Sequence, residues 1–271
     1  MTHLQRAAAL LAGSLALATA ACTDGKPDPI TLTADAPASP AAVPDADLKA
    51  LADGNNAFAV DLFKRVAAGT HRDVVFSPLS IRTVLALTYA GKRGRTAEEM
   101  REVLRFTLPN DRLHAATNAT IRRLTGGPAD APGRTEIANA LWLHDKSTIS
   151  EAFQLLADRH YAAGLNRVDF RSPGSAIDQI NRWVHDRTHG VIPDLVNEAD
   201  VTESTRLVLV NAVYLKDDWA KPFQAEHTKD APFHVGPGQT VPVRMMHASH
   251  ELKYAEADGV RLLVMPYSRP G

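Results

Sequence analysis

The sequence contains a single cysteine, few aromatic residues and almost no net charge. Its one cysteine, Cys22, cannot form a disulfide within the chain. Aromatic residues make up 6% of the 271 positions, and the formal net charge of −1 gives no sign of a nucleic-acid partner or an acidic tail. After residue 22, no stretch approaches the roughly 20 apolar residues that a membrane helix requires. The hydrophobic content of 45% instead predicts a globular domain with one substantial core.

The first 21 residues have the features of an export signal peptide. Arg6 supplies a positive charge, Ala7–Ala21 is a short apolar run, and small residues precede Cys22. Cleavage before Cys22 would make it the lipidated first residue of a bacterial-type lipoprotein, although Thr19 stands where such signals usually carry Leu. The alternative is ordinary cleavage at that point or one residue earlier, which releases a secreted protein. Either way we expect an exported protein, at the cell surface, in the periplasm or outside the cell.

A segment rich in proline and alanine follows Cys22. Residues 22–47 contain five prolines among Ala, Asp, Ser and Thr, and few large apolar residues. Such a segment cannot bury enough surface to offset the entropy lost on ordering. We therefore predict a disordered tether over residues 22–47 and a globular domain over residues 48–271.

Within the globular part, apolar periodicity predicts helices first and strands later. Helices are predicted at about 55–67, 77–91, from 96, and at about 150–161 and 175–189; strands are predicted at 74–76, 137–143, 165–168, 207–215, 231–235, 241–246, 251–254 and 260–265. Ser77 and Pro78 have the residue types of an N-cap and a first helical position. The unbroken apolar run at 207–215 predicts a central strand covered on both faces. This order of elements indicates an α+β fold with helices packed on large mixed or antiparallel β-sheets.

Two histidines on a predicted helix are candidate zinc ligands. His185 and His189 lie four residues apart, as in the HExxH motif of zinc hydrolases. Asp186 follows the first histidine where that motif has Glu, no third ligand stands out, and both histidines fall off the apolar face of the helix. A solvated helix side explains them better, so a zinc hydrolase is a distant alternative. Ser77 is not in a G-x-S-x-G turn and no Gly-rich phosphate loop is present, so we predict no enzyme, no cofactor and no metal.

Six strings, in order, resemble segments typical of the serpin family of serine protease inhibitors. They are VVFSPLSI at 74–81, TYAGKRGRTAEEMREVL at 88–104, ANALWLHDKSTISEAF at 138–153, INRWVHDRTHGVIPDLV at 180–196, TRLVLVNAVYLKDDWAKPF at 205–223 and VRMMHASHELKYAEADGVRLLVMPY at 243–267. The resemblance covers the chain from about Leu51 to the end. It implies a serpin-like fold and a monomeric inhibitor of serine proteases, with cysteine proteases as a second target class.

The resemblance also implies a mechanism and a set of site residues. In serpins a protease cuts an exposed reactive loop, which then inserts as a strand into the large sheet and distorts the trapped protease. Ser77, Ser80 and Asn211 match the shutter region under the centre of that sheet. Trp219 matches the breach, where the loop first enters. Asn211 also has a purely structural interpretation as a satisfied core amide, and Trp219 has one as a large core aromatic.

The same resemblance implies that the chain stops before the reactive loop and the last strands of the fold. We therefore expect no reactive bond within the 271 residues, whether because the sequence is a fragment or because the gene is truncated. The alternative to an inhibitor is a non-inhibitory binding or structural protein with the same fold.

Overall fold

The computed structural model describes residues 42–69, 73–126 and 133–268, which form two compact units. Cys22 and most of the predicted tether lie outside the described residues. The first unit contains helices α1 (Asp45–Ala67), α2 (Pro78–Ala90), α3 (Gly94–Val103), α4 (Asn110–Thr125), α5 (Glu151–Tyr161) and α6 (Pro173–Arg187), with most of strands β1 (Arg134–His144), β2 (Gly164–Val168) and β3 (Leu207–Lys216). No helix among the described residues is both long enough and apolar enough to cross a membrane.

The sheet of the first unit has the strand order β2-β1-β3. Strands β1 and β2 run parallel, with Ala140 opposite Gly164 and His144 opposite Val168. At the other side of β1, the His144 N–H donates to the carbonyl of Arg206 at 3.0 Å, so the end of β1 lies beside the start of β3. That placement is the one expected of an antiparallel pair. The sheet is therefore mixed, as the sequence predicted.

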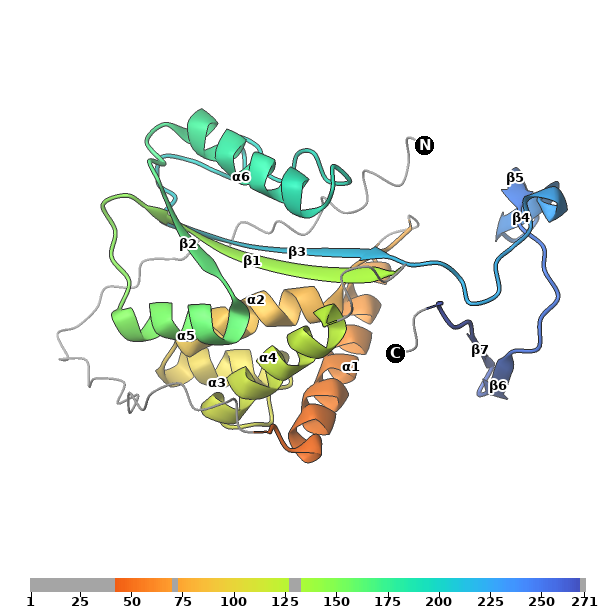
Figure 1. Ribbon diagram of the computed structural model, residues 1–271, viewed down its shortest axis with the longest axis horizontal. Helices are drawn as coiled ribbons and strands as arrows, with labels where there is room; N and C mark the ends of the chain where they lie inside the picture. Colours follow the sequence, from red (N-terminus) through yellow and green to blue (C-terminus); the bar gives the residue numbers. More distant parts are fainter. Residues whose placement is uncertain (1–41, 70–72, 127–132, 269–271) are drawn as a thin grey trace. The chain divides into compact units, whose positions relative to one another are not determined.

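Strand β3 is covered on both faces by helices (Figure 1). Leu207 and Leu209 pack with the core of α1, α2, α4 and α5, whereas Val208 and Val210 pack with the core of α6. The prediction of a strand covered on both faces is thus confirmed. The prediction of a central position is wrong for the described part of the sheet, because β3 has a paired neighbour only on the β1 side there.

The first helix begins ten residues earlier than predicted and shortens the expected tether. Helix α1 starts at Asp45, not near residue 55, so residues 45–47 belong to the folded domain. Asp47 is only 2% exposed, and its carboxylate accepts two hydrogen bonds from Arg112 on α4, one of them at 2.9 Å from Nε. The hydrogen bonds from Arg112 lower the pKa of Asp47. This long-range ion pair, together with the burial of Leu51, fixes the first turns of the helix.

The start of α2 agrees with its sequence signal, whereas the preceding segment does not. Ser77 is the N-cap, its Oγ accepts the N–H of Ser80 at 3.2 Å, and Pro78 is the first helical residue. The strand predicted at 74–76 is absent, and Val75 is 71% exposed. A strand needs a neighbour to pair its backbone groups, and no described strand pairs with this segment.

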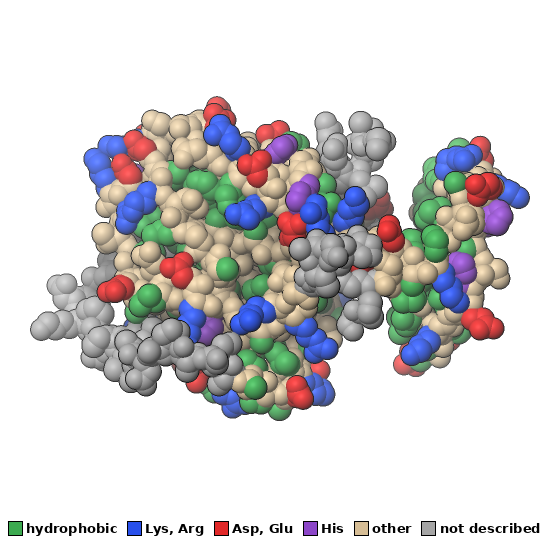
Figure 2. Space-filling model, viewed as in Figure 1, with side chains coloured by type: hydrophobic (Ala, Val, Ile, Leu, Met, Phe, Trp, Pro, Cys, Tyr) green, Lys and Arg blue, Asp and Glu red, His purple; other side chains and the backbone are tan. Residues whose placement is uncertain are grey.

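The second unit consists of residues 133–135 and 215–268 among those described. It contains the short 3₁₀ turn Ala225–His227, the hairpin of β4 (Lys229–Gly236) and β5 (Gln239–Met245), and the hairpin of β6 (Lys253–Ala257) and β7 (Val260–Val264). Both hairpins are antiparallel, and glycines turn each of them with positive φ, as at Gly259. Hydrophobic side chains show at the surface of this unit (Figure 2). Phe233 and Leu262 are among its exposed apolar residues. The predicted strands are therefore present as hairpins with largely exposed side chains.

Candidate functional site

A chain of hydrogen bonds connects α2, the sheet and α5 on the face of the sheet that packs against α2. The Ser80 hydroxyl donates to Oδ1 of Asn211 on β3. Nδ2 of Asn211 donates to Oδ1 of Asn139 on β1 at 2.7 Å. Nδ2 of Asn139 in turn donates to the carbonyl of Tyr161 at 2.8 Å. We call Ser80, Asn211, Asn139 and the Tyr161 carbonyl the sheet network.

The sheet network places polar groups where the surrounding side chains are apolar. Along β1 and β3, Asn139 and Asn211 point to the same face as the leucines of the helical core, because side chains alternate along a strand. An amide left without a partner there costs about 1–3 kcal/mol. The two amides satisfy one another across adjacent strands and are tied at either end to a helix. The network thus connects the sheet to the helices beneath it through side-chain hydrogen bonds.

The structure brings together two of the three residues that the resemblance assigned to the shutter. Ser80 and Asn211 are in direct contact, whereas Ser77 acts one step away by capping α2 and holding the N–H of Ser80. Sequence reasoning missed Asn139 and the carbonyl of Tyr161. The signal for Asn139 was present, because it is the one polar residue in the strand predicted at 137–143.

Tyr161 extends the polar contacts into α4 through its side chain. Its hydroxyl lies 2.6 Å from Nδ1 of His114, and both side chains are buried. Burial, reinforced by the nearby charge of His160, lowers the pKa of His114 to about 4. Burial also raises the pKa of the Tyr161 phenol. His114 is therefore neutral at physiological pH, and Tyr161 keeps its proton.

Trp219, assigned to the breach, lies in the second unit and is half-buried. Its ring stacks on that of Tyr267 with a centroid distance of 4.8 Å and an interplanar angle of 9°. The backbone of the two residues forms an isolated β-bridge, and the N–H of Ala220 donates to the carbonyl of Pro266 at 3.0 Å. The ring lines a shallow hollow together with Asp217, Asp218, Pro222, Phe223 and Met246. Trp219 thus stacks on one aromatic ring and also borders a hollow in the surface of the second unit.

The two candidate zinc histidines have different partners. Nδ1 of His185 lies 3.2 Å from the carboxylate of its neighbour Asp186. Nε2 of His189 lies 3.0 and 3.1 Å from the two carboxylate oxygens of Glu136 on β1, and its ring centroid lies 4.6 Å from that of Tyr214 on β3. In the part of the chain that is described, neither histidine belongs to a three-ligand group with metal-binding distances. The geometry therefore does not form an HExxH-type site.

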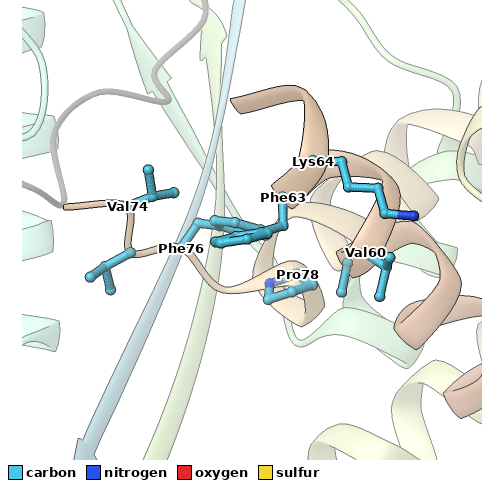
Figure 3. Close-up of a pocket in the computed structure, with 8 residues that line it drawn as sticks. Val60, Phe63, Lys64, Val74, Phe76 and Pro78 are labelled. Carbon is cyan, nitrogen blue, oxygen red and sulfur yellow. The ribbon is translucent and has the colours of Figure 1, made fainter. Parts of the chain in front are cut away.

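An apolar groove with a volume of about 620 Å³ lies between α1 and the segment that leads into α2 (Figure 3). The rings of Phe63 and Phe76 stack across it with a centroid distance of 6.5 Å. Val60 and Pro78 extend the apolar lining, and Lys64 is the one charged residue that lines it. With no cluster of convergent polar groups, the groove offers contact area and no reactive chemistry.

Comparisons with known proteins agree with this architecture. Residues 53–271 match a family model described as "Serpin (serine protease inhibitor)". The chain is 37% identical over 220 residues to an uncharacterized serpin-like protein of Thermococcus kodakarensis, covering 81% of this chain and 50% of that protein. It is 36% identical over 217 residues to the leukocyte elastase inhibitor of Xenopus laevis, covering 78% of this chain and 56% of that protein. The structure of emu (Dromaius novaehollandiae) ovalbumin matches with a TM-score of 0.76 and 26% identity, over 80% of this chain and 60% of that one. The chain thus spans about half the length of the curated relatives it matches.

Proposed function

The chain belongs to the serpin family of serine protease inhibitors, which has a mixed α+β fold and is not a family of enzymes, and we propose that the whole protein inhibits serine proteases. The zinc-hydrolase alternative is wrong, because the chain belongs to a family of inhibitors and because His185 and His189 contact different carboxylates, Asp186 and Glu136. The proposed mechanism is suicide-substrate trapping, in which a cleaved loop inserts as a strand into the sheet that contains β1–β3. Cysteine proteases are the second target class.

Loop insertion makes two physical demands on the described residues. The sheet must accept a new strand through main-chain hydrogen bonds, and the native state must be held kinetically above a more stable inserted state. Among the described strands, β3 is paired only with β1. The sheet network supports the second demand, because moving β3 relative to α2 requires the Ser80–Asn211 hydrogen bond to break. This hydrogen bond is the observation on which the proposal rests.

The direct test uses the protein produced from the full reading frame that contains these residues. It is incubated with elastase-, trypsin-, chymotrypsin- and subtilisin-type serine proteases and with a papain-type cysteine protease. Boiling in detergent before electrophoresis should leave a covalent complex with at least one serine protease. Cleavage of the protein with release of every protease would refute inhibition and support the non-inhibitory binding or structural alternative.

We also propose that the protein is exported and held at a membrane surface through a lipid on Cys22. The positive residue, the short apolar run and the small residues before Cys22 support export. The segment from Cys22 to about residue 44 would then act as a spacer between the lipid and α1. Such a spacer lets a protease approach the domain without contact with the membrane.

A further inference from the structure

The carboxyl ends of the parallel strands β1 and β2 bring a histidine and two aspartates together. His144 is the last residue of β1, Asp145 follows it, and Asp169 follows the last residue of β2. One ligand atom from each of the three lies within 4.8 Å of the other two. His144 is only 5% exposed, whereas Asp145 is exposed and Asp169 is half-buried. The group therefore combines one buried side chain, that of His144, with a solvent-accessible carboxylate, that of Asp145.

Backbone pairing between β1 and β2 fixes the positions of these three residues. His144 is paired with Val168 in the parallel register, and the N–H of Asp145 donates to the carbonyl of Val168 at 2.9 Å. The two loops that carry the aspartates are thus joined directly beneath the side chains. Ligands carried by paired strand ends keep their geometry better than ligands on separate loops.

Nδ1 of His144 lies beside a backbone N–H and a carboxylate oxygen. This Nδ1 accepts the N–H of Lys146 at 3.1 Å, so a metal ion at this nitrogen has to displace that N–H from the single lone pair. The same Nδ1 lies 2.7 Å from Oδ1 of Asp145. A neutral imidazole nitrogen is the form in which histidine binds a metal ion.

A cationic side chain already lies between the two carboxylates. The guanidinium of Arg171 donates to Asp169 at 2.7 and 2.8 Å, and its Nη2 lies 3.5 Å from Oδ2 of Asp145. The guanidinium therefore already compensates the charge of the Asp169 carboxylate. The Arg171 side chain is 50% exposed and has room to turn into solvent.

We propose that His144, Asp145 and Asp169 form a binding site for a divalent transition-metal ion of the zinc type, with Arg171 as an internal competing cation. One imidazole nitrogen and two carboxylate oxygens are ligands that zinc accepts at about 2.0–2.2 Å, with water completing the coordination. Ligand atoms around one such ion lie at most about 4 Å apart, so a side-chain shift of about 1 Å closes the site. Arg171 swings outward when the ion enters.

The bound ion would join two connections of the fold. Asp145 lies in the link from β1 to α5, and Asp169 lies in the link from β2 to α6. An ion that binds the folded state and not the unfolded chain stabilises it by mass action. The site would therefore make the stability of the first unit depend on the metal concentration, independently of any protease inhibition.

The test measures Zn²⁺ bound to the full chain after treatment with a chelator, by equilibrium dialysis and elemental analysis. Asp145→Asn keeps the side-chain shape and should weaken binding at this site by more than the roughly 10–100-fold that loss of an outer-shell partner costs. Arg171→Gln removes the competing charge and should tighten binding on the order of tenfold. Mg²⁺, which prefers oxygen ligands, should not replace Zn²⁺.

His185→Ala is the matched control, since it removes an exposed histidine that lies beside a single aspartate. It should leave the affinity and the zinc-induced rise in melting temperature unchanged. Zinc affinities that are equal in the wild type, Asp145→Asn and Arg171→Gln proteins would overturn the proposal, and so would a wild-type chain that binds no zinc. Loss of binding only in His185→Ala would assign the zinc to that histidine instead.

Discussion

Replacing Asn211 by alanine tests the sheet network most directly. The substitution removes the acceptor of the Ser80 hydroxyl and the donor to Oδ1 of Asn139. Each partner left without a hydrogen bond costs about 1–3 kcal/mol, and Asn211 itself is half-buried, so the expected loss is about 2–4 kcal/mol. For a protein of this size, such a loss lowers the melting temperature by about 4–16 °C.

A double-mutant cycle isolates the link between helix and sheet. Ser80→Ala, Asn211→Ala and the double variant should show a coupling free energy of about 0.5–3 kcal/mol, because the two side chains are in contact. Asn166→Ala on β2 is a matched control: its Nδ2 reaches only the carbonyl of Leu141, at 3.5 Å. That variant should lose less than about 1 kcal/mol.

The first assay is thermal unfolding monitored by circular dichroism. In the whole protein, the same variants are also compared by the ratio of trapped to released protease. If the network resists movement of β3, Asn211→Ala should alter both the melting temperature and the trapping ratio. Additive losses in the cycle, with Asn166→Ala as damaging as Asn211→Ala, would show that the contact is ordinary packing and that our reasoning is wrong.

Four further outcomes are expected. Fatty-acid labelling in cells should mark the wild type and not Cys22→Ser, and label on neither would exclude the lipid anchor. The 271 residues alone should form no detergent-stable complex with any protease, because the resemblance places no reactive bond among them; one such band would contradict this. The pKa of His114 falls from 6.5 to about 4 on folding, so the stability that its neutral form contributes is present above pH 6.5 and lost as the pH falls towards 4. Chemical unfolding at pH 7 and pH 4.5 should therefore show a loss on the order of 2–3 kcal/mol that His114→Phe does not show. Gly54→Ala would place Cβ 2.5 Å from the carbonyl oxygen of Arg105 and should cost about 1–3 kcal/mol on chemical unfolding, and an unchanged midpoint would count against this close approach.

The sequence predicted features that depend on neighbours along the chain. The cap at Ser77 needs only the following residues, and the apolar run at 207–215 is visible within one strand. Features that depend on distant partners were missed. The early start of α1 depends on Asp47 meeting Arg112, 65 positions away, and the segment 74–76 is apolar enough for a strand but lacks a paired neighbour.

The same distinction between local and distant partners applies to the residues of the candidate site. The family resemblance indicated Ser80 and Asn211, because both lie in recognisable strings. Asn139 lies in such a string too, yet its role appears only once β1 and β3 are paired. Asp145 and Asp169 are brought together by the parallel register of β1 and β2, which the order of residues does not reveal. Contacts across a sheet require the topology, which local patterns leave open.

The alternation of leucine and valine in β3 affects the register in which the strand pairs with its neighbour. Leu207-Val208 and Leu209-Val210 are near-copies of one another, so a slip of β3 by two residues would keep every apolar side chain on its proper face. The amide of Asn211 breaks that degeneracy, because a slipped strand would carry it away from Asn139 and present an aliphatic side chain in its place. A single polar position can set alignment in this way in coiled coils. With leucine at position 211, β3 should populate two alignments, visible as doubled amide resonances for its residues.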